Sequence, residues 1–316
     1  MKLLAVLALA FAATQAAAQG YPSKPVRMVN PFPPGGPLDV LGRILSERLG
    51  AGLGRPVLVE NRPGAAGNIG AAEVARSPGD GHTLLLTLFS IVTSNPHLYE
   101  RLAFDPLKDF APITAIANSD SVLIVHPSVQ VSSAQELVAY AKANPGKLNY
   151  ASAGKASPGH LTAEFFGRRT GAAFTHVPYK GNAEAIRSVL AGETQMMFTP
   201  TTGALPHIKS GKLKVLAVYL TERVEDLPGV PSLEGFDQKT LPFWYGLLAP
   251  AGTPREIVLR LNSETVKALR EPQVEKALRA GRIFPIGNTP EEFGAMMREG
   301  HAAWGRVIRE TGVKGE

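Results

Sequence analysis

The sequence of 316 residues contains no cysteine. This absence excludes disulfides, thiolate metal ligands and cysteine nucleophiles, so the fold must be stabilised by burial of a hydrophobic core. Runs of positive charge are missing too: the formal net charge is +6, but the lysines and arginines are scattered and are not interleaved with aromatic residues. Nucleic-acid-binding proteins usually carry such clusters, so no nucleic-acid partner is expected.

No long apolar run follows the N-terminal segment of the chain. That segment itself has the composition of a secretory signal. Lys2 precedes an apolar run over residues 3–13 that is too short to span a bilayer, and three alanines follow at residues 16–18. The pattern predicts a signal peptide over residues 1–18, cleavage after about Ala18 and an exported protein.

Signatures of catalysis and of metal binding are missing. The seven histidines show no close pairing of the kind that holds a metal. Ser152, His160 and Asp39 are the residues from which a serine hydrolase would be assembled, but the sequence has no G-x-S-x-G elbow. We therefore expect no catalytic residue, no metal and no cofactor, and keep a periplasmic serine hydrolase only as a remote alternative.

The remaining pattern predicts an α/β fold. Hydrophobic residues make up 44% of the chain, enough to bury a large core in two domains. Short β-rich runs alternate with amphipathic segments over residues 26–88 and again over residues 148–218, which is typical of parallel sheets covered by helices. Thr253 and Thr289 each precede a proline and, three residues later, a glutamate, so each is expected to cap a helix.

Two extended apolar runs, at residues 121–126 and 243–250, flank the second α/β series. No further α/β repeat follows, so the C-terminal helices are expected to pack on the first domain. The sequence thus predicts two doubly wound lobes that are joined by two extended crossings and enclose a ligand cleft. Residues 19–121 and 243–316 form lobe 1, and residues 122–242 form lobe 2.

Two glycine-rich loops follow strands at the expected cleft. In residues 31–39, PFPPGGPLD, the glycines allow backbone amides at a helix start to approach an anion, and the helix dipole favours negative charge there. An ordinary strand-to-helix turn is the alternative. Residues 150–160 form a counterpart in lobe 2, where Ser157 and Pro158 suit the N-cap and first helical positions.

Five stretches, in order along the chain, resemble the Bug family, the extracytoplasmic solute receptors of tripartite tricarboxylate transporters. They are PFPPGGPLD (31–39), VENRPGAAGNIGA (59–71), LNYASAGKASPGHL (148–161), HVPYKG (176–181) and FWYGLLAPAGTP (243–254). The resemblance implies a type II periplasmic binding protein, expected to be a monomer, that closes on a small organic carboxylate and delivers it to membrane permease subunits. A receptor that acts on a two-component sensor is the alternative.

The resemblance also implies ligand contacts. In lobe 1 they are Phe32, Gly35, Gly36 and Asp39, and in lobe 2 they are Ser152, Ala153, Gly154, Ser157 and His160. Asp39 is expected to hold the loop rather than the ligand, because two anions repel. His160 either donates to a carboxylate or caps its helix.

Three departures from the family pattern add further candidates. Pro37 and Leu38 replace a polar pair, residues 87–92 are more apolar than usual, and Thr199 and Pro200 stand where relatives carry Asp-Asn. Phe89, Ser90 and Thr199 are therefore also predicted to face the ligand, whereas Lys155, Trp244 and Tyr245 stay undecided. The changes favour a monocarboxylate with an aliphatic or aromatic body.

Overall fold

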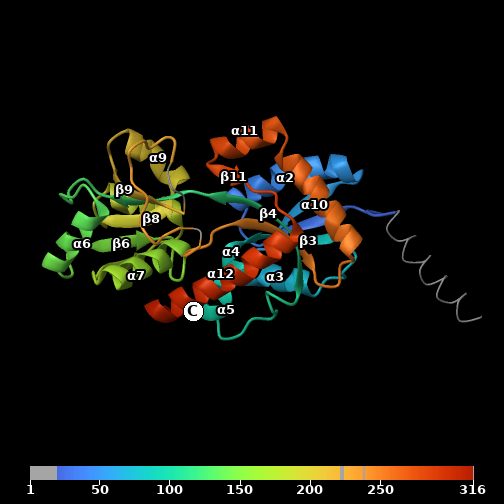
Figure 1. The fold of residues 1–316 in the computed structure, drawn as a ribbon, viewed down its shortest axis with the longest axis horizontal. Coiled ribbons are helices and arrows are strands. Elements are labelled where there is room, and N and C mark those ends of the chain that lie inside the picture. The colour runs from blue at the N-terminus through green and yellow to red at the C-terminus, as the bar shows by residue number, and fades with distance from the viewer. Residues whose placement is uncertain (1–19, 221–223, 238, 316) are drawn as a thin grey trace, which may run out of the picture.

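Two β-sheets, each covered by helices, divide the protein into two lobes that lie side by side along its long axis (Figure 1). The computed structural model describes residues 20–220, 224–237 and 239–315. The signal peptide predicted over residues 1–18 lies outside the described residues. None of the described helices is both long and apolar enough to cross a membrane.

Lobe 1 is built on a six-stranded sheet in the order β11-β4-β10-β3-β1-β2. Its strands are β1 (Val26–Asn30), β2 (Val57–Asn61), β3 (Thr83–Leu88), β4 (Phe110–Ser119), β10 (Tyr245–Pro250) and β11 (Ile283–Pro285). Its helices are α2 (Pro37–Leu53), η1 (Ala65–Gly67), α3 (Asn68–Ala75), α4 (Phe89–Thr93), α5 (Asn95–Leu98), α10 (Arg255–Leu269), α11 (Pro272–Ala280) and α12 (Pro290–Thr311).

Lobe 2 is built on a five-stranded sheet in the order β7-β6-β8-β5-β9. Its strands are β5 (Ser121–Val125), β6 (Asn149–Ser152), β7 (Thr175–Pro178), β8 (Met196–Pro200) and β9 (Lys214–Tyr219). Its helices are α6 (Ala134–Ala143), α7 (Pro158–Thr170), α8 (Asn182–Leu190) and α9 (Thr201–Lys209).

The strands that cross between the lobes run antiparallel to their neighbours. The pairs β1–β2, β1–β3, β6–β7 and β6–β8 are parallel, as the alternation of elements predicts. In contrast, β10 is antiparallel to β3 and β4, and β5 is antiparallel to β8 and β9. A strand that arrives from the other lobe enters its sheet at the edge where the parallel strands end, so it must run the opposite way. The lobe boundaries at residues 121 and 243 stay predictions.

Helix α2 shows how local sequence positions the cleft. Pro37 occupies the first helical position, and Gly54 ends the helix in the left-handed conformation with φ 70°. Between them Leu41, Leu45 and Leu49 are fully buried at four-residue spacing against the first sheet. The helix therefore starts at the cleft and runs away from it.

Two of the predicted helix caps are present and one is wrong. Ser157 accepts a hydrogen bond from the His160 N–H at the start of α7, and Thr289 forms a full capping box at the start of α12. Helix α10, however, begins at Arg255 with Pro254 at the N-cap, and the buried Thr253 hydroxyl has no partner among the described residues. The reason is a turn in which the Thr253 N–H donates to Pro250 O at 3.0 Å, which places Thr253 before the helix.

A buried ion pair holds the crossing between β4 and β5. Asp120 is the single residue between these strands, and its side chain is 2% exposed. Arg282, from the segment between α11 and β11, donates to the Asp120 carboxylate and, through Nη1, to Asp226 Oδ2 at 2.7 Å. Asp226 also accepts from Lys209 Nζ at 2.7 Å. Arg282 therefore ties lobe 1 to the crossing and to lobe 2.

We predict that Arg282→Ala lowers the free energy of unfolding by about 3 kcal/mol or more, because it leaves the Asp120 carboxylate buried without its partner. Arg255→Ala is the matched control, since it removes an ion pair to Glu291 whose side chains are 74% and 57% exposed. The control should change stability far less, because ion pairs between exposed side chains contribute little. Urea denaturation of both variants measures the difference, and equal effects would contradict a structural role for Arg282.

Candidate ligand-binding cleft

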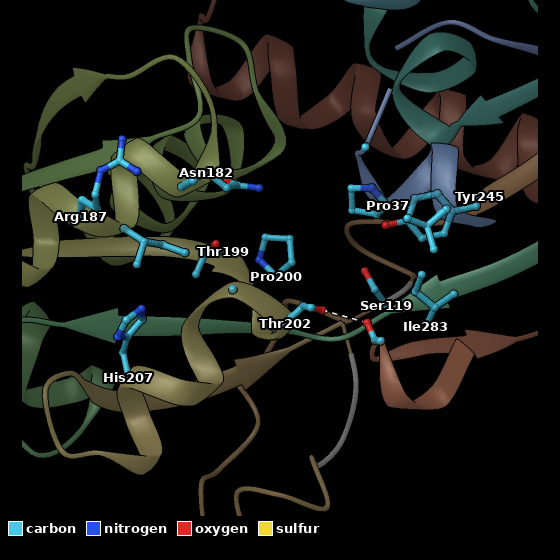
Figure 2. A pocket seen from close by; sticks show the side chains of 16 residues that line it. Pro37, Ser119, Asn182, Arg187, Thr199, Pro200, Thr202, His207, Tyr245 and Ile283 are labelled. Carbon is cyan, nitrogen blue, oxygen red and sulfur yellow. Dashed lines mark hydrogen bonds between the residues drawn. The ribbon is translucent and has the colours of Figure 1, made fainter. Parts of the chain in front are cut away.

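The two lobes enclose a cleft that consists of two connected cavities. The larger has a volume of about 840 Å³ and the smaller about 640 Å³. Figure 2 shows the smaller cavity, with Asn182, Thr199 and His207 on one side and Pro37 and Tyr245 on the other. Six residues line both cavities, so the space is continuous. They are Gly35, Pro37, Asn182, Ala183, Pro200 and Tyr245.

The cleft lies where parallel strands end and helices begin. In lobe 1 the loop after β1 leads into α2. In lobe 2 the loops after β6 and β7 lead into α7 and α8, and β8 continues directly into α9. The carboxyl edge of a parallel sheet is the usual ligand site of such folds, because backbone N–H groups and helix dipoles point there. The sequence alone predicted α2 and α7 in this role, but not α8.

Asp39 accepts a hydrogen bond from one backbone N–H of the first loop. Its Oδ2 accepts from the Gly35 N–H at 3.0 Å and from Arg43 Nε at 2.9 Å, and its Oδ1 accepts from Asn61 Nδ2 at 3.0 Å. The hydrogen bonds from Arg43, above all, lower the pKa of Asp39 to about 2. The Gly35 amide is therefore already paired with a carboxylate of the protein, in agreement with the expectation that Asp39 organises the loop.

Gly36 leaves space in the cleft without needing an unusual backbone. Its φ of −78° and ψ of 168° are extended, and a Cβ there would meet only Pro33 O, at 3.8 Å. Gly159 is different, because a Cβ there would lie 2.5 Å from Phe198 O. The start of α7 therefore packs directly on the backbone of β8, and this contact requires glycine.

The second loop is held by its own hydrogen bonds. The buried Ser152 hydroxyl lies 2.7 Å from His176 Nε2 and accepts from the Gly154 N–H at 3.2 Å. Ser157 caps α7 by accepting from the His160 N–H at 3.4 Å. The His160 ring in turn accepts, at Nδ1, from the Ala156 N–H at 2.8 Å. His160 thus serves the loop in the manner of a capping residue.

The predicted site residues divide into those that line the cavities and those that lie behind them. Seven line one or both cavities: Phe32, Gly35, Gly36, Asp39, Ala153, Ser157 and Thr199. Five do not: Phe89, Ser90, Ser152, Gly154 and His160. Direct ligand contact by any of these twelve residues stays a prediction.

Phe89 lies behind the cavity lining rather than in it. It is fully buried, with its ring centroid 4.8 Å from that of Phe243 and 5.3 Å from that of Trp304, and both of those residues face the larger cavity. Ser90 follows it in α4 and accepts, through its backbone carbonyl, from Ser94. Helix α4 therefore supports the lining from the core side.

The three undecided residues also have clear positions. Tyr245 lines both cavities, and burial raises the pKa of its hydroxyl to about 12. Trp244 is fully buried against Phe293, with ring centroids 4.9 Å apart, and Lys155 lines neither cavity.

Several lining residues were missed from the sequence. Lys180 lies within the HVPYKG stretch and Asn182 follows it, just after the end of β7. Leu88 ends β3 and Tyr219 ends β9, so the rule of strand ends could have found all four. No local signal marks the others, which reach the cleft through long-range packing. Examples are Thr162, Leu241, Phe243 and Trp304.

Two stacked histidines lie beneath the second loop. The rings of His160 and His176 are 3.9 Å apart and nearly parallel, at 7°, and Tyr150 stacks on His176 at 4.8 Å. Burial lowers the pKa of both histidines to about 4. Protonation would place two cations face to face and would remove the acceptor of the Ala156 N–H.

We predict that stability falls as the pH is lowered from 6.5 toward 4, because the unfolded chain then binds protons that the folded pair does not. Each histidine contributes a slope of at most about 1.4 kcal/mol per pH unit, reached only between its folded and unfolded pKa values. Urea titrations across this range should show a flatter dependence for the double variant His160→Gln/His176→Gln. The same pH dependence in the wild-type protein and the double variant would show that the two histidines do not control it.

The fold places the protein in the class of two-lobed periplasmic binding proteins, and the comparisons define its family. The chain belongs to the tripartite tricarboxylate transporter receptor family, whose model matches residues 41–313. It is 35% identical to Protein BugT of Bordetella pertussis over 320 residues, which cover 99% of this chain and 98% of that protein. The family is one of periplasmic solute-binding receptors, not of enzymes.

Two solved structures of relatives contain carboxylates. Rpa4515 of R. palustris with adipate has a TM-score of 0.81 and 31% identity, covering 94% of this chain and 100% of that chain. MatC of Rhodopseudomonas palustris with bound malate has a TM-score of 0.77 and 29% identity, covering 91% of this chain and 100% of that chain. Relatives of this fold thus hold small carboxylates.

Proposed function

We propose that this protein captures a small organic carboxylate in the cleft by closure of its lobes, as a monomer, and delivers it to the permease subunits of a tripartite transporter. The observation that carries the proposal is the continuous cleft between lobes, onto which the starts of α2, α7 and α8 open. The adipate and malate bound by relatives support a carboxylate as the ligand.

Closure of the lobes would supply most of the affinity. Backbone amides, hydroxyls and bridging water each contribute modestly, but they are shielded from solvent once the lobes meet. One hydrogen bond already spans the two sides, since Thr202 Oγ1 donates to Gly281 O at 3.0 Å (Figure 2). A ligand between the lobes would add further contacts of this kind.

We predict that Gly36→Val weakens carboxylate binding at least ten-fold while the protein still folds. The extended backbone accepts valine, but the side chain fills part of the larger cavity. Gly252→Val is the matched control, because a Cβ at Gly252 meets nothing within 4 Å and the residue lines neither cavity. Calorimetry on both variants, after a thermal-shift screen of carboxylic acids, tests the proposal. Unchanged affinity in Gly36→Val would remove the first loop from the site.

Delivery to a permease needs a separate test. Uptake of the identified acid by cells that carry the adjacent permease subunits should depend on this receptor. Binding without receptor-dependent uptake would favour the sensor instead, and no binding of any acid would contradict the carboxylate proposal itself.

A further inference from the structure

The two ends of the cleft differ in polarity. Leu88, Phe243 and Trp304 line only the larger cavity, and together they make its lobe 1 side apolar. Leu241, just before the second crossing, adds to this apolar surface. Among the described lining residues of the lobe 1 side, the charged one is Asp39, whose carboxylate is held by Arg43 and by the Gly35 N–H. A ligand carboxylate on the lobe 1 side would therefore lie near the Asp39 carboxylate. No unpaired cation among the described lining residues of this side would balance its charge.

The lobe 2 side carries the cations of the cleft. Lys180, just before α8, lines the larger cavity. Arg187 of α8 lines the smaller one, together with the polar ring of His207 from α9 (Figure 2). Asn182, the first residue of α8, lines both. The acid in the first turn of α8, Glu184, accepts from the Lys180 N–H at 2.8 Å and lines neither cavity.

Thr199 adds an independent indication of a polar ligand group. Its side chain is 99% buried, it lines the smaller cavity, and its hydroxyl has no hydrogen-bond partner among the described residues. A buried hydroxyl without a partner is unfavourable, and a ligand oxygen in the cleft would satisfy it. By contrast, the buried Tyr219 hydroxyl in the larger cavity is already hydrogen-bonded to Ser121 and Thr162.

We propose, building on carboxylate capture in this cleft, that the ligand is a monocarboxylate with an apolar body. Its carboxylate lies where the two cavities join, against Thr199 and the start of α8. Its body extends into the larger cavity against Leu88, Phe243 and Trp304. A dicarboxylate such as adipate is disfavoured. Its second carboxylate would lie against hydrophobic side chains and the negatively charged Asp39.

Matched acids test this orientation. Calorimetry on the mature protein would compare hexanoate with adipate, and phenylacetate with 1,4-phenylenediacetate, with hexanamide as the uncharged control. We expect the monocarboxylate of at least one pair to bind ten-fold or more tighter than its dicarboxylate, and hexanamide to bind at least ten-fold more weakly than hexanoate. Tighter binding of the dicarboxylates overturns the inference but keeps the carboxylate proposal. No binding by any of the four acids or malate contradicts both.

Thr199→Val tests the position of the carboxylate without changing the shape of the side chain. Affinity for the bound monocarboxylate should fall ten-fold or more, while the melting temperature of the ligand-free protein rises, because an unpaired buried hydroxyl is removed. Thr265→Val is the control: Thr265 is buried in α10, is hydrogen-bonded to Leu261 O at 2.7 Å and lines neither cavity. Unchanged affinity in Thr199→Val would overturn the proposed position.

Phe32→Arg tests whether the apolar body of the ligand extends to the lobe 1 side of the larger cavity. Phe32 is half-buried in the larger cavity, so arginine there adds a cation to the lobe 1 side. The ratio of adipate to hexanoate affinity should rise at least ten-fold, whereas Phe32→Ala should weaken hexanoate without this change in preference. An unchanged ratio in Phe32→Arg would show that the far end of the ligand does not reach this side.

Discussion

The passage of the chain from one sheet to the other through Asp120 determines where the ligand site can be. Because β4 ends at Ser119 and β5 begins at Ser121, the edge at which lobe 1 strands end must face the same edge of lobe 2. The loops that lead into α2, α7 and α8 are therefore brought together, although they are far apart in the sequence. The crossing is short and buried, which is why its carboxylate needs Arg282.

The helix starts that meet in the cleft are not equivalent as anion sites. At α2, Asp39 folds back onto the Gly35 N–H, so the protein supplies its own anion to the amide that the glycine pair exposes. At α7 the first turn contains no acid. A glycine-rich loop before a helix thus predicts space for a ligand more reliably than it predicts backbone N–H groups that are free to bind one. A nearby acidic side chain can accept hydrogen bonds from those N–H groups instead.

Much of the fold and part of the site could be predicted from local sequence. The helix starts at Pro37, Pro158 and Pro290 follow from proline and from the capping residues before the last two. The strands between these helices follow from hydrophobic periodicity. The apolar surface formed by Leu241, Phe243 and Trp304 could not, because it depends on how the second crossing and α12 pack together. Trp304, for example, is placed by a hydrogen bond from its Nε1 to Pro242 O at 2.9 Å, across 62 residues of sequence.

The balance between stability and binding is most visible at Thr199. Valine would fit the same volume in β8 and would remove a buried hydroxyl that lacks a partner, at a gain of about 1–3 kcal/mol if nothing else changed. A polar group kept at such a position needs a compensating interaction in some state of the protein. The neighbouring cavity is the one place where that interaction can come from outside the chain, because the side chain lines it. With the ligand carboxylate placed against Thr199 as proposed, the ligand-bound state is the one in which the hydroxyl gains a partner. The same group that weakens the empty protein would then favour closure around an oxygen-bearing ligand.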